Sequence, residues 1–210
     1  MVKSFIISMI ISIFLITILN IFLNKNSKSL KKKIEWQHYF FGYLFILYLM
    51  ISLTEVVGFP YLSDWQRLSR LNSPIFNPII NLVPFNDGFE ISSILNIIFF
   101  MPFGFLLPTL WKKYRKLLPT LCNGILFSII IEIGQLFVPH RASDINDLIM
   151  NTIGTICGWI IFNIISKIFH KLANKTVIEI SSNDSMAIKL EPYLYIAIPI
   201  ISTFLGLKNE

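Results

Sequence analysis

The stretch SFIISMIISIFLITILNIFL, residues Ser4–Leu23, contains no charged residue and is long enough to cross a membrane. A transmembrane helix needs about 20 consecutive, mostly apolar residues to cross the hydrocarbon core. Similar segments follow along the chain, at Tyr39–Phe59, Ser92–Leu110, Leu117–Val138 and Leu148–Phe169. A shorter sixth segment, Tyr193–Leu207, carries Pro199, and its length leaves open whether it crosses the membrane or lies at the interface.

The composition agrees with this pattern, because 54% of the 210 residues are hydrophobic and only 14% are charged. Soluble domains keep about a quarter of their residues charged. The sequence therefore predicts an all-α fold, a polytopic integral membrane bundle of five to six transmembrane helices. We expect an N-terminal anchor and basic cytoplasmic loop over residues 1–38, and a main transmembrane domain over 39–170. Residues 171–210 would form a cytoplasmic segment and a short final apolar helix.

Two further features of the sequence bear on its class. No small-residue cleavage site follows the first apolar segment, so we interpret that segment as an anchor rather than a signal peptide. Cys122 and Cys157 both lie within apolar segments, which favours small buried hydrophobic residues over a disulfide.

The Lys and Arg residues indicate which way the segments face. Thirteen of the 18 lie in the first, third and fifth loops, as with Lys112, Lys113 and Lys116 in the third. Cytoplasmic loops carry the excess of Lys and Arg, so these three loops are expected in the cytoplasm. The loops 58–91 and 139–147 would then face outward. The net charge of +6 follows the same loops, which fits membrane orientation rather than nucleic-acid binding.

The outward loop 139–147 and the helix ends beside it hold a cluster of polar residues. Glu132 and Gln135 are three apart on the fourth segment and share one helix face. Asp144 and Asp147 have the same spacing, and Asn151 lies one turn further. A structural interpretation of these carboxylates is that Ser143 or Asp144 caps the fifth helix, with Asp147 in its first turn.

Glu132 is the residue of this cluster that most needs an explanation. It lies seven residues before Pro139, or about 10 Å along a helix, and so within the edge of the hydrocarbon. A carboxylate at that depth needs a cation, a proton or a hydrogen-bond network. One alternative is a structural ion pair with Arg141. The other is an outward-facing polar pocket that binds a head group or performs acid–base chemistry.

The preceding outward loop and the third segment add further polar and helix-breaking residues. Asn81 lies in the loop, and Asn96 is expected one turn inside the outer surface. Pro102 and Gly104 occur in the middle of the segment and are expected to loosen its helix, as a packing kink or as a hinge. Gly154 and Gly158 have the spacing typical of close helix packing.

Taken in order, these residues match the pattern N-x-x-PF, N-x-x-x-F-x-P-x-G-x-x-x-P, E-x-x-Q and R-x-x-D-x-x-D-x-x-x-N-x-x-G. This pattern resembles the VanZ-like membrane family over about Tyr39–Phe169. The matching positions are Asn81, Pro84, Phe85, Asn96, Pro102, Gly104, Glu132, Gln135, Arg141, Asp144, Asp147, Asn151 and Gly154. The tail after Lys171 does not map onto the pattern. The resemblance implies a bacterial cell-envelope protein, and the family's namesake is associated with low-level resistance to the glycopeptide teicoplanin.

The first hypothesis is therefore a protein that binds a lipid-linked cell-wall component or a glycopeptide through the outer polar cluster. Its ligand-binding candidates are Asn81, Asn96, Glu132, Gln135, Arg141, Asp144, Asp147 and Asn151. Arg141 would suit a phosphate or a carboxylate. Membrane lipids are the other expected partners, and no nucleic acid is expected.

The main alternative is an intramembrane enzyme that modifies such a lipid-linked precursor. Glu132 would be its acid or base, and Asp144 and Asp147 would be further catalytic candidates that could hold a divalent cation. We assign no resident metal site, and the sequence does not identify a cofactor. The weakness of this alternative is that carboxylates alone make no recognisable catalytic motif. A transporter and a structural scaffold are further alternatives, although the absence of an inverted repeat disfavours transport.

Overall fold

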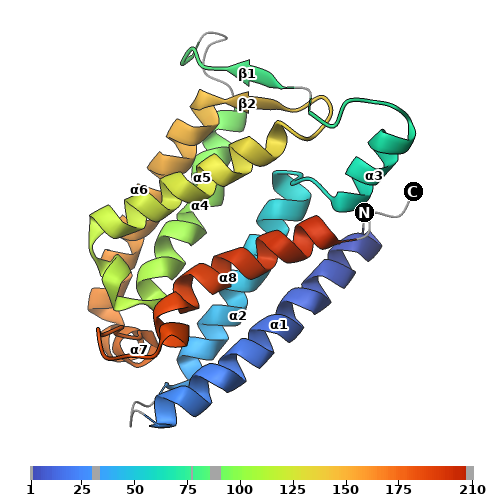
Figure 1. The fold of residues 1–210 in the computed structure, drawn as a ribbon. Helices are drawn as coiled ribbons and strands as arrows, with labels where there is room; N and C mark the ends of the chain where they lie inside the picture. Colours follow the sequence, from blue (N-terminus) through green and yellow to red (C-terminus); the bar gives the residue numbers. More distant parts are fainter. Residues whose placement is uncertain (1, 30–33, 77, 86–90, 207–210) are drawn as a thin grey trace.

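The computed structural model describes residues 2–29, 34–76, 78–85 and 91–206, and its arrangement is shown in Figure 1. Within these residues, six helices are long and apolar enough to cross a membrane. They are α1 (Val2–Ser29), α2 (Trp36–Ile51), α4 (Ile91–Leu110), α5 (Leu117–Gln135), α6 (Ile145–Ile168) and α8 (Met186–Leu205). A π-helical turn, η1 (Ser52–Val56), extends α2. The all-α transmembrane bundle predicted from the sequence is confirmed. Part of the predicted basic first loop, Lys31–Lys33, lies outside the described residues. So do Leu207, the predicted end of the last apolar segment, and Lys208.

Short elements connect these helices. They are α3 (Leu62–Arg70), β1 (Ile79–Asn81), η2 (Lys112–Arg115), β2 (Ala142–Asp144) and α7 (His170–Thr176). The strands were not expected, and they pair in parallel, with Asn81 opposite Asp144. The pairing joins two loops that the sequence places about 60 residues apart, and it brings the polar residues of both loops to one end of the bundle (Figure 1).

The helices form two groups. Helices α4, α5 and α6 pack together, and α1, α2 and α8 form the second group, which meets the first where α2 packs on α4 (Figure 1). The most extensive helix pair is α4 with α6. A Cβ atom on Gly158 would lie 2.0 Å from the carbonyl oxygen of Met101, and one on Gly154 would lie 2.3 Å from that of Ile97. The close packing expected for Gly154 and Gly158 is therefore present.

The proline and glycine of α4 do not break the helix. Pro102 and Pro108 both lie inside an α4 that continues from Ile91 to Leu110. A Cβ on Gly104 would lie 2.0 Å from the carbonyl oxygen of Thr155 on α6. Gly104 is thus a point of close approach between α4 and α6, and the hinge interpretation finds no break in the helix to support it.

The last helix is longer than the sequence indicated. Tyr193–Leu207 was expected as a short segment, but α8 begins at Met186 and has 20 residues. The difference arises because Glu191 is fully buried rather than solvated. Its Oε1 atom lies 2.9 Å from Nε2 of His38, and its Oε2 atom accepts a hydrogen bond from the indole N–H of Trp111 at 3.2 Å. Glu191 interrupts the apolar pattern in the sequence, but in the structure it lies inside α8, and the helix continues on both sides of it.

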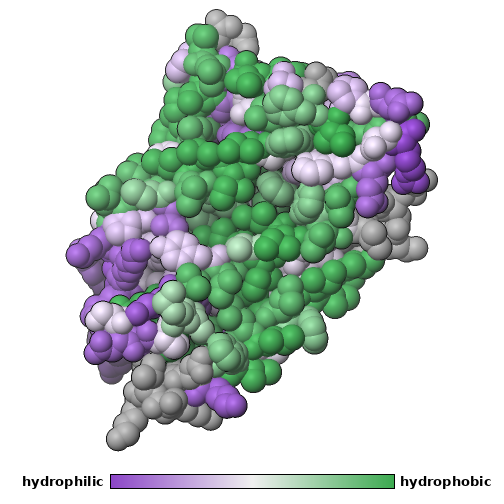
Figure 2. Space-filling model, viewed as in Figure 1, coloured by the Kyte–Doolittle hydropathy of each residue, from purple (hydrophilic) through white to green (hydrophobic). Residues whose placement is uncertain are grey.

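The surface is apolar over the long helices and polar near their ends (Figure 2). Residues such as Phe14, Ile21 and Leu118 expose more than 60% of their surface. Such a band suits a bilayer, where exposed apolar side chains contact lipid. The expectation that both cysteines are buried is wrong, because this apolar surface of the long helices is not covered by other parts of the chain. Cys122 is exposed on α5, and Cys157 is only partly covered.

Candidate functional site

The polar residues singled out in the sequence meet where α5 ends and α6 begins. Glu132 and Gln135 lie on the last turns of α5, and both are buried. Asp144 is the N-cap of α6, where its side chain accepts a hydrogen bond from the backbone N–H of Asn146 at 2.8 Å. The capping interpretation is therefore confirmed for Asp144. Asp147 follows in the first turn of α6, near the positive end of the helix dipole.

Asp144 also connects the two strands to this helix end. Its Oδ2 atom accepts a hydrogen bond from Nδ2 of Asn81 at 3.2 Å. Its backbone N–H donates to Oε2 of Glu132 at 2.9 Å. The parallel pairing of β1 with β2 places Asn81 for the first of these bonds. One residue thus holds together β1, the start of α6 and the buried carboxylate of α5.

Glu132 and Gln135 each keep one acceptor atom without a protein partner. Oε1 of Glu132 and Oε1 of Gln135 are both buried, and neither accepts a hydrogen bond from a residue that the structure describes. Buried polar groups in proteins are nearly always paired, because an unpaired one costs about 1–3 kcal/mol. The two open acceptors therefore define a place where a donor from outside the chain would be stabilised.

The neighbouring amides are paired within the protein. Asn96 on α4 donates to Oδ1 of Asp147. Asn151, one turn further along α6, donates to Oγ of Ser128 at 2.9 Å. These bonds connect α4, α5 and α6 around the carboxylates, so the orientation of Asp147 is set by the protein itself.

Most of these residues line one small cavity, which we call the polar cavity. Its volume is about 70 Å³. The lining residues are Val56, Val57, Asn96, Phe99, Phe100, Ile131, Glu132, Gln135, Arg141, Asp147 and Asn151. Of the eight candidates from the sequence, six line the cavity, and Asn81 and Asp144 support it from the strand side. Typical ligand pockets measure about 300–1,000 Å³, so this cavity has room for one functional group of a ligand.

Arg141 does not pair with Glu132. No ion pair joins Glu132 and Arg141, both of which the structure describes, so the expected structural pair is not formed. The reason is that the backbone N–H of Asp144 occupies one oxygen of Glu132, while Arg141 is exposed and extends toward Gly58. Gly58 has a φ of +64°, and a Cβ there would lie 3.3 Å from Nη2 of Arg141. The guanidinium therefore lies at the cavity, where it forms no ion pair with any residue that the structure describes.

The arrangement offers acceptors inside the polar cavity and a cation among its lining residues. Within the described part of the chain, no three His, Cys, Asp or Glu side chains gather closely enough to hold a metal ion. Asp144 and Asp147, which the enzyme alternative offered to a divalent cation, are instead engaged by Asn81, Asn146 and Asn96. The geometry suits a ligand that carries both hydrogen-bond donors and an anionic group.

Sequence reasoning missed some residues that build this site. Ser128 holds Asn151, and its position four residues before Glu132 on the same face of α5 was an available signal. Asn146 accepts a hydrogen bond from the backbone N–H of Phe85 at 2.9 Å and so ties the segment after β1 to the start of α6. Val56 and Val57 come from the end of the α2 segment, and no local pattern places them beside α4 and α5.

Comparisons with known proteins give the following findings. A family model described as VanZ/LLP1 matches residues 43–166. The chain is 33% identical over 89 residues to Protein VanZ of Enterococcus faecium, an alignment that covers 42% of this chain and 55% of that relative. The chain thus aligns with about half the length of this relative. No solved structure matches the chain.

Proposed function

The chain belongs to the VanZ/LLP1 family, and from this premise we propose a cell-envelope function for the polar cavity. In this proposal the protein lowers susceptibility to teicoplanin-type glycopeptides by engaging a lipid-linked envelope component, or the drug, through that cavity. The observation that carries the proposal is the pair of buried, unpartnered acceptors on Glu132 and Gln135. They lie in the same small cavity as the free guanidinium of Arg141.

The size of the cavity favours the lipid-linked component over the drug. A volume of about 70 Å³ excludes a glycopeptide as a whole and admits a single ammonium, amide or hydroxyl group. Such a group would donate to Glu132 and Gln135, while Arg141 would contact a neighbouring phosphate or carboxylate. A lipid-linked precursor carries both kinds of group close together.

We place the polar cavity on the extracytoplasmic side of the membrane. The basic helix η2 follows α4 at the opposite end from Asn96. Leu110 lies fourteen positions after Asn96, which corresponds to about 21 Å of helix, most of the hydrocarbon thickness. Because the Lys-rich end is expected in the cytoplasm, the cavity end would face outward.

The test is glycopeptide susceptibility in a sensitive Gram-positive host. The host would express the wild-type chain, Glu132→Gln, Asp147→Asn or the control Glu179→Gln at equal membrane abundance. Glu179 is exposed, and it pairs with Lys112 beside the opposite end of the bundle. We expect the wild type and the control to protect, and both cavity variants to lose protection. Protection by all four chains would make the cavity structural. The absence of protection by the wild type would refute the resistance role.

One observation favours a second candidate, an intramembrane enzyme. A buried carboxylate oxygen that has no partner and faces a cavity is suited to accept or donate a proton, and Oε1 of Glu132 has that position. An enzyme would leave a covalently altered envelope lipid, whereas a binding protein would not. Mass spectrometry of the lipids from cells with the wild type and with Glu132→Gln distinguishes the two. A lipid species that depends on Glu132 would establish the enzyme.

A further inference from the structure

The open groups inside the polar cavity are hydrogen-bond acceptors. Oε1 of Glu132 and Oε1 of Gln135 have no partner among the described residues, and both side chains are more than nine-tenths buried. The amide nitrogens of Asn96 and Asn151, which line the same cavity, already donate to other side chains of the protein. A ligand group that satisfies the interior of this cavity must therefore bring donors, and it finds few donors for an acceptor of its own.

A primary ammonium meets this requirement better than a hydroxyl or an amide. An ammonium has three donors and no acceptor, so one group can serve both open oxygens. A hydroxyl has a single donor and would leave one of the two oxygens open. A primary amide has two donors but adds a carbonyl oxygen that needs a donor in turn. An ammonium takes about as much space as a water molecule, roughly 30 Å³, so the cavity of about 70 Å³ also holds the adjoining methylene.

The charges of the cavity also favour a cation in its interior. Glu132 and Asp147 supply two carboxyl groups to the lining, against the single guanidinium of Arg141. Arg141 is exposed whereas Glu132 is buried, so the positive charge lies toward the surface and the carboxyl group of Glu132 toward the interior. Phe99 and Phe100 line the same cavity, and aromatic rings attract cations. An ammonium inside and an anionic group outside match this order of charges.

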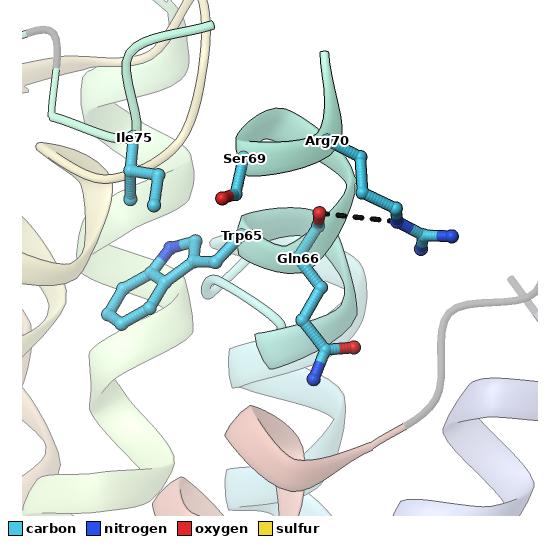
Figure 3. Close-up of a pocket in the computed structure, with 5 residues that line it drawn as sticks. All are labelled: Trp65, Gln66, Ser69, Arg70 and Ile75. Carbon is cyan, nitrogen blue, oxygen red and sulfur yellow. Dashed lines mark hydrogen bonds between the residues drawn. The ribbon is translucent and has the colours of Figure 1, made fainter. Parts of the chain in front are cut away.

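The larger hollow beside α3 does not offer this combination. It measures about 620 Å³ and is lined by Trp65, Gln66, Ser69, Arg70 and Ile75, without a carboxylate. Figure 3 shows the indole of Trp65 and the guanidinium of Arg70 on opposite sides of α3, so the two groups do not converge on one ligand. The α3 hollow therefore cannot hold an ammonium in the way that the polar cavity can, and its residues can serve as controls.

We propose that the polar cavity binds the primary ammonium of a zwitterionic lipid head group, whose phosphate or carboxylate contacts Arg141. This inference rests on the proposed use of the cavity as a ligand site, and it names the chemical class of the ligand. A quaternary ammonium is excluded because it has no N–H to donate. The same chemistry occurs in an ethanolamine phospholipid and in a lipid-linked wall precursor that carries a free peptide amine.

The test is lipid retention by the purified full-length protein in detergent, measured by native mass spectrometry. The phospholipid probes are phosphatidylethanolamine, its N-acetylated form and phosphatidylcholine, all with identical acyl chains. The second set is a lipid-linked wall precursor whose peptide amine is free or acetylated. We expect the free amine to be retained roughly tenfold better than the blocked forms, because a charge-assisted contact is lost on blocking. The set that shows the preference identifies the source of the ammonium.

Two variants of similar size link the preference to the cavity. Glu132→Gln removes the carboxylate and should reduce the tenfold preference to about twofold or less. Gln135→Met removes the second open oxygen at nearly constant side-chain length and should reduce the preference severalfold. The matched controls Glu179→Gln and Gln66→Met make the same exchanges at exposed positions and should keep the wild-type preference. A single symmetric elution peak for every variant shows that any loss does not come from misfolding.

Equal retention of free and blocked amines by the wild type in both sets would overturn the proposal, since a proton alone would then satisfy Glu132. A preference that survives Glu132→Gln would also overturn it, because the amine would bind elsewhere. The result is separable from the drug assay. A preference that depends on Glu132, in a chain that gives no drug protection, would support this inference and refute only the resistance role. Drug protection that depends on Glu132, without any amine preference, would do the reverse.

Discussion

Replacing Glu191 by Ala is expected to destabilise the protein more than any exposed carboxylate substitution. Glu191 on α8 is fully buried, and it contacts His38 on α2 and Trp111, which lies between α4 and η2. Its Oε1 atom lies 2.9 Å from Nε2 of His38 on α2, while Nδ1 of His38 lies 2.9 Å from the carbonyl oxygen of Thr176 on α7. The carbonyl can only accept, so Nδ1 carries a proton and Nε2 faces the carboxylate. The second acceptor contact is with Trp111.

The size of the effect follows from these contacts. Removing the carboxylate leaves the indole N–H of Trp111 and the imidazole of His38 without their partner in a dry environment. Breaking a buried pair by removing one partner costs about 3–5 kcal/mol. For a chain of this size, each kcal/mol corresponds to about 2–4 °C in Tm. We therefore expect Tm to fall by roughly 6–20 °C.

The assay is thermal unfolding of the purified protein in detergent, followed by the fraction that remains monodisperse after heating. Glu179→Ala is the matched control, because Glu179 makes an exposed ion pair with Lys112 at 2.8 Å. Exposed pairs contribute about 0–1 kcal/mol, so the control should lower Tm by no more than a few degrees. His38→Ala combined with Glu191→Ala should cost less than the sum of the single variants, because the two residues share one interaction.

A specific result would refute this reasoning. Hydrogen bonds between transmembrane helices contribute only about 0.6 kcal/mol on average, with a maximum near 1.7. If Glu191→Ala lowered Tm no more than Glu179→Ala, the buried pair would belong to that weak class. The position of α8 would then depend on apolar packing alone.

Two further predictions concern packing and topology. Gly158→Ala should push α6 away from the carbonyl oxygen of Met101 and cost about 1–3 kcal/mol, whereas Ile160→Ala on the exposed face of the same helix should cost less, as measured by Tm. In a chain whose two native cysteines are replaced by serine, Pro139→Cys should react with an impermeant thiol reagent in whole cells, and Lys116→Cys only after the cells are lysed. The opposite labelling pattern would place the polar cavity in the cytoplasm.

The sequence predicts the membrane helices well because hydropathy is a local property. Each span depends on about 20 neighbouring residues, so the five longer segments could be located without knowledge of their partners. The length of α8 was underestimated for a non-local reason. Glu191 interrupts the apolar pattern, and only its distant partners His38 and Trp111 make its burial favourable. No local pattern carries that information.

The candidate site was predictable to the extent that helix periodicity determines it. The spacing of Glu132 with Gln135 and of Asp144 with Asp147 puts each pair on one face, and the short loop brings the two helix ends together. The contribution of Asn81 could not be predicted in this way. It reaches Asp144 through parallel strand pairing, which depends on how two distant loops meet. The free position of Arg141 also depends on the fold, because the backbone N–H that occupies Glu132 belongs to β2.

Glu132 and Glu191 look alike in the sequence, since each is a carboxylate within or beside an apolar helix, but the fold treats them differently. Both oxygens of Glu191 have hydrogen-bond partners in the protein, so neither is left open for a ligand. Among the described residues, Glu132 has a donor for one oxygen, and its other oxygen lies at a cavity whose lining includes Gln135 and the guanidinium of Arg141. An open buried acceptor costs stability, so it is retained where something else supplies the donor. On this argument Glu191 is expected to affect stability first, and Glu132 to affect function at nearly unchanged stability.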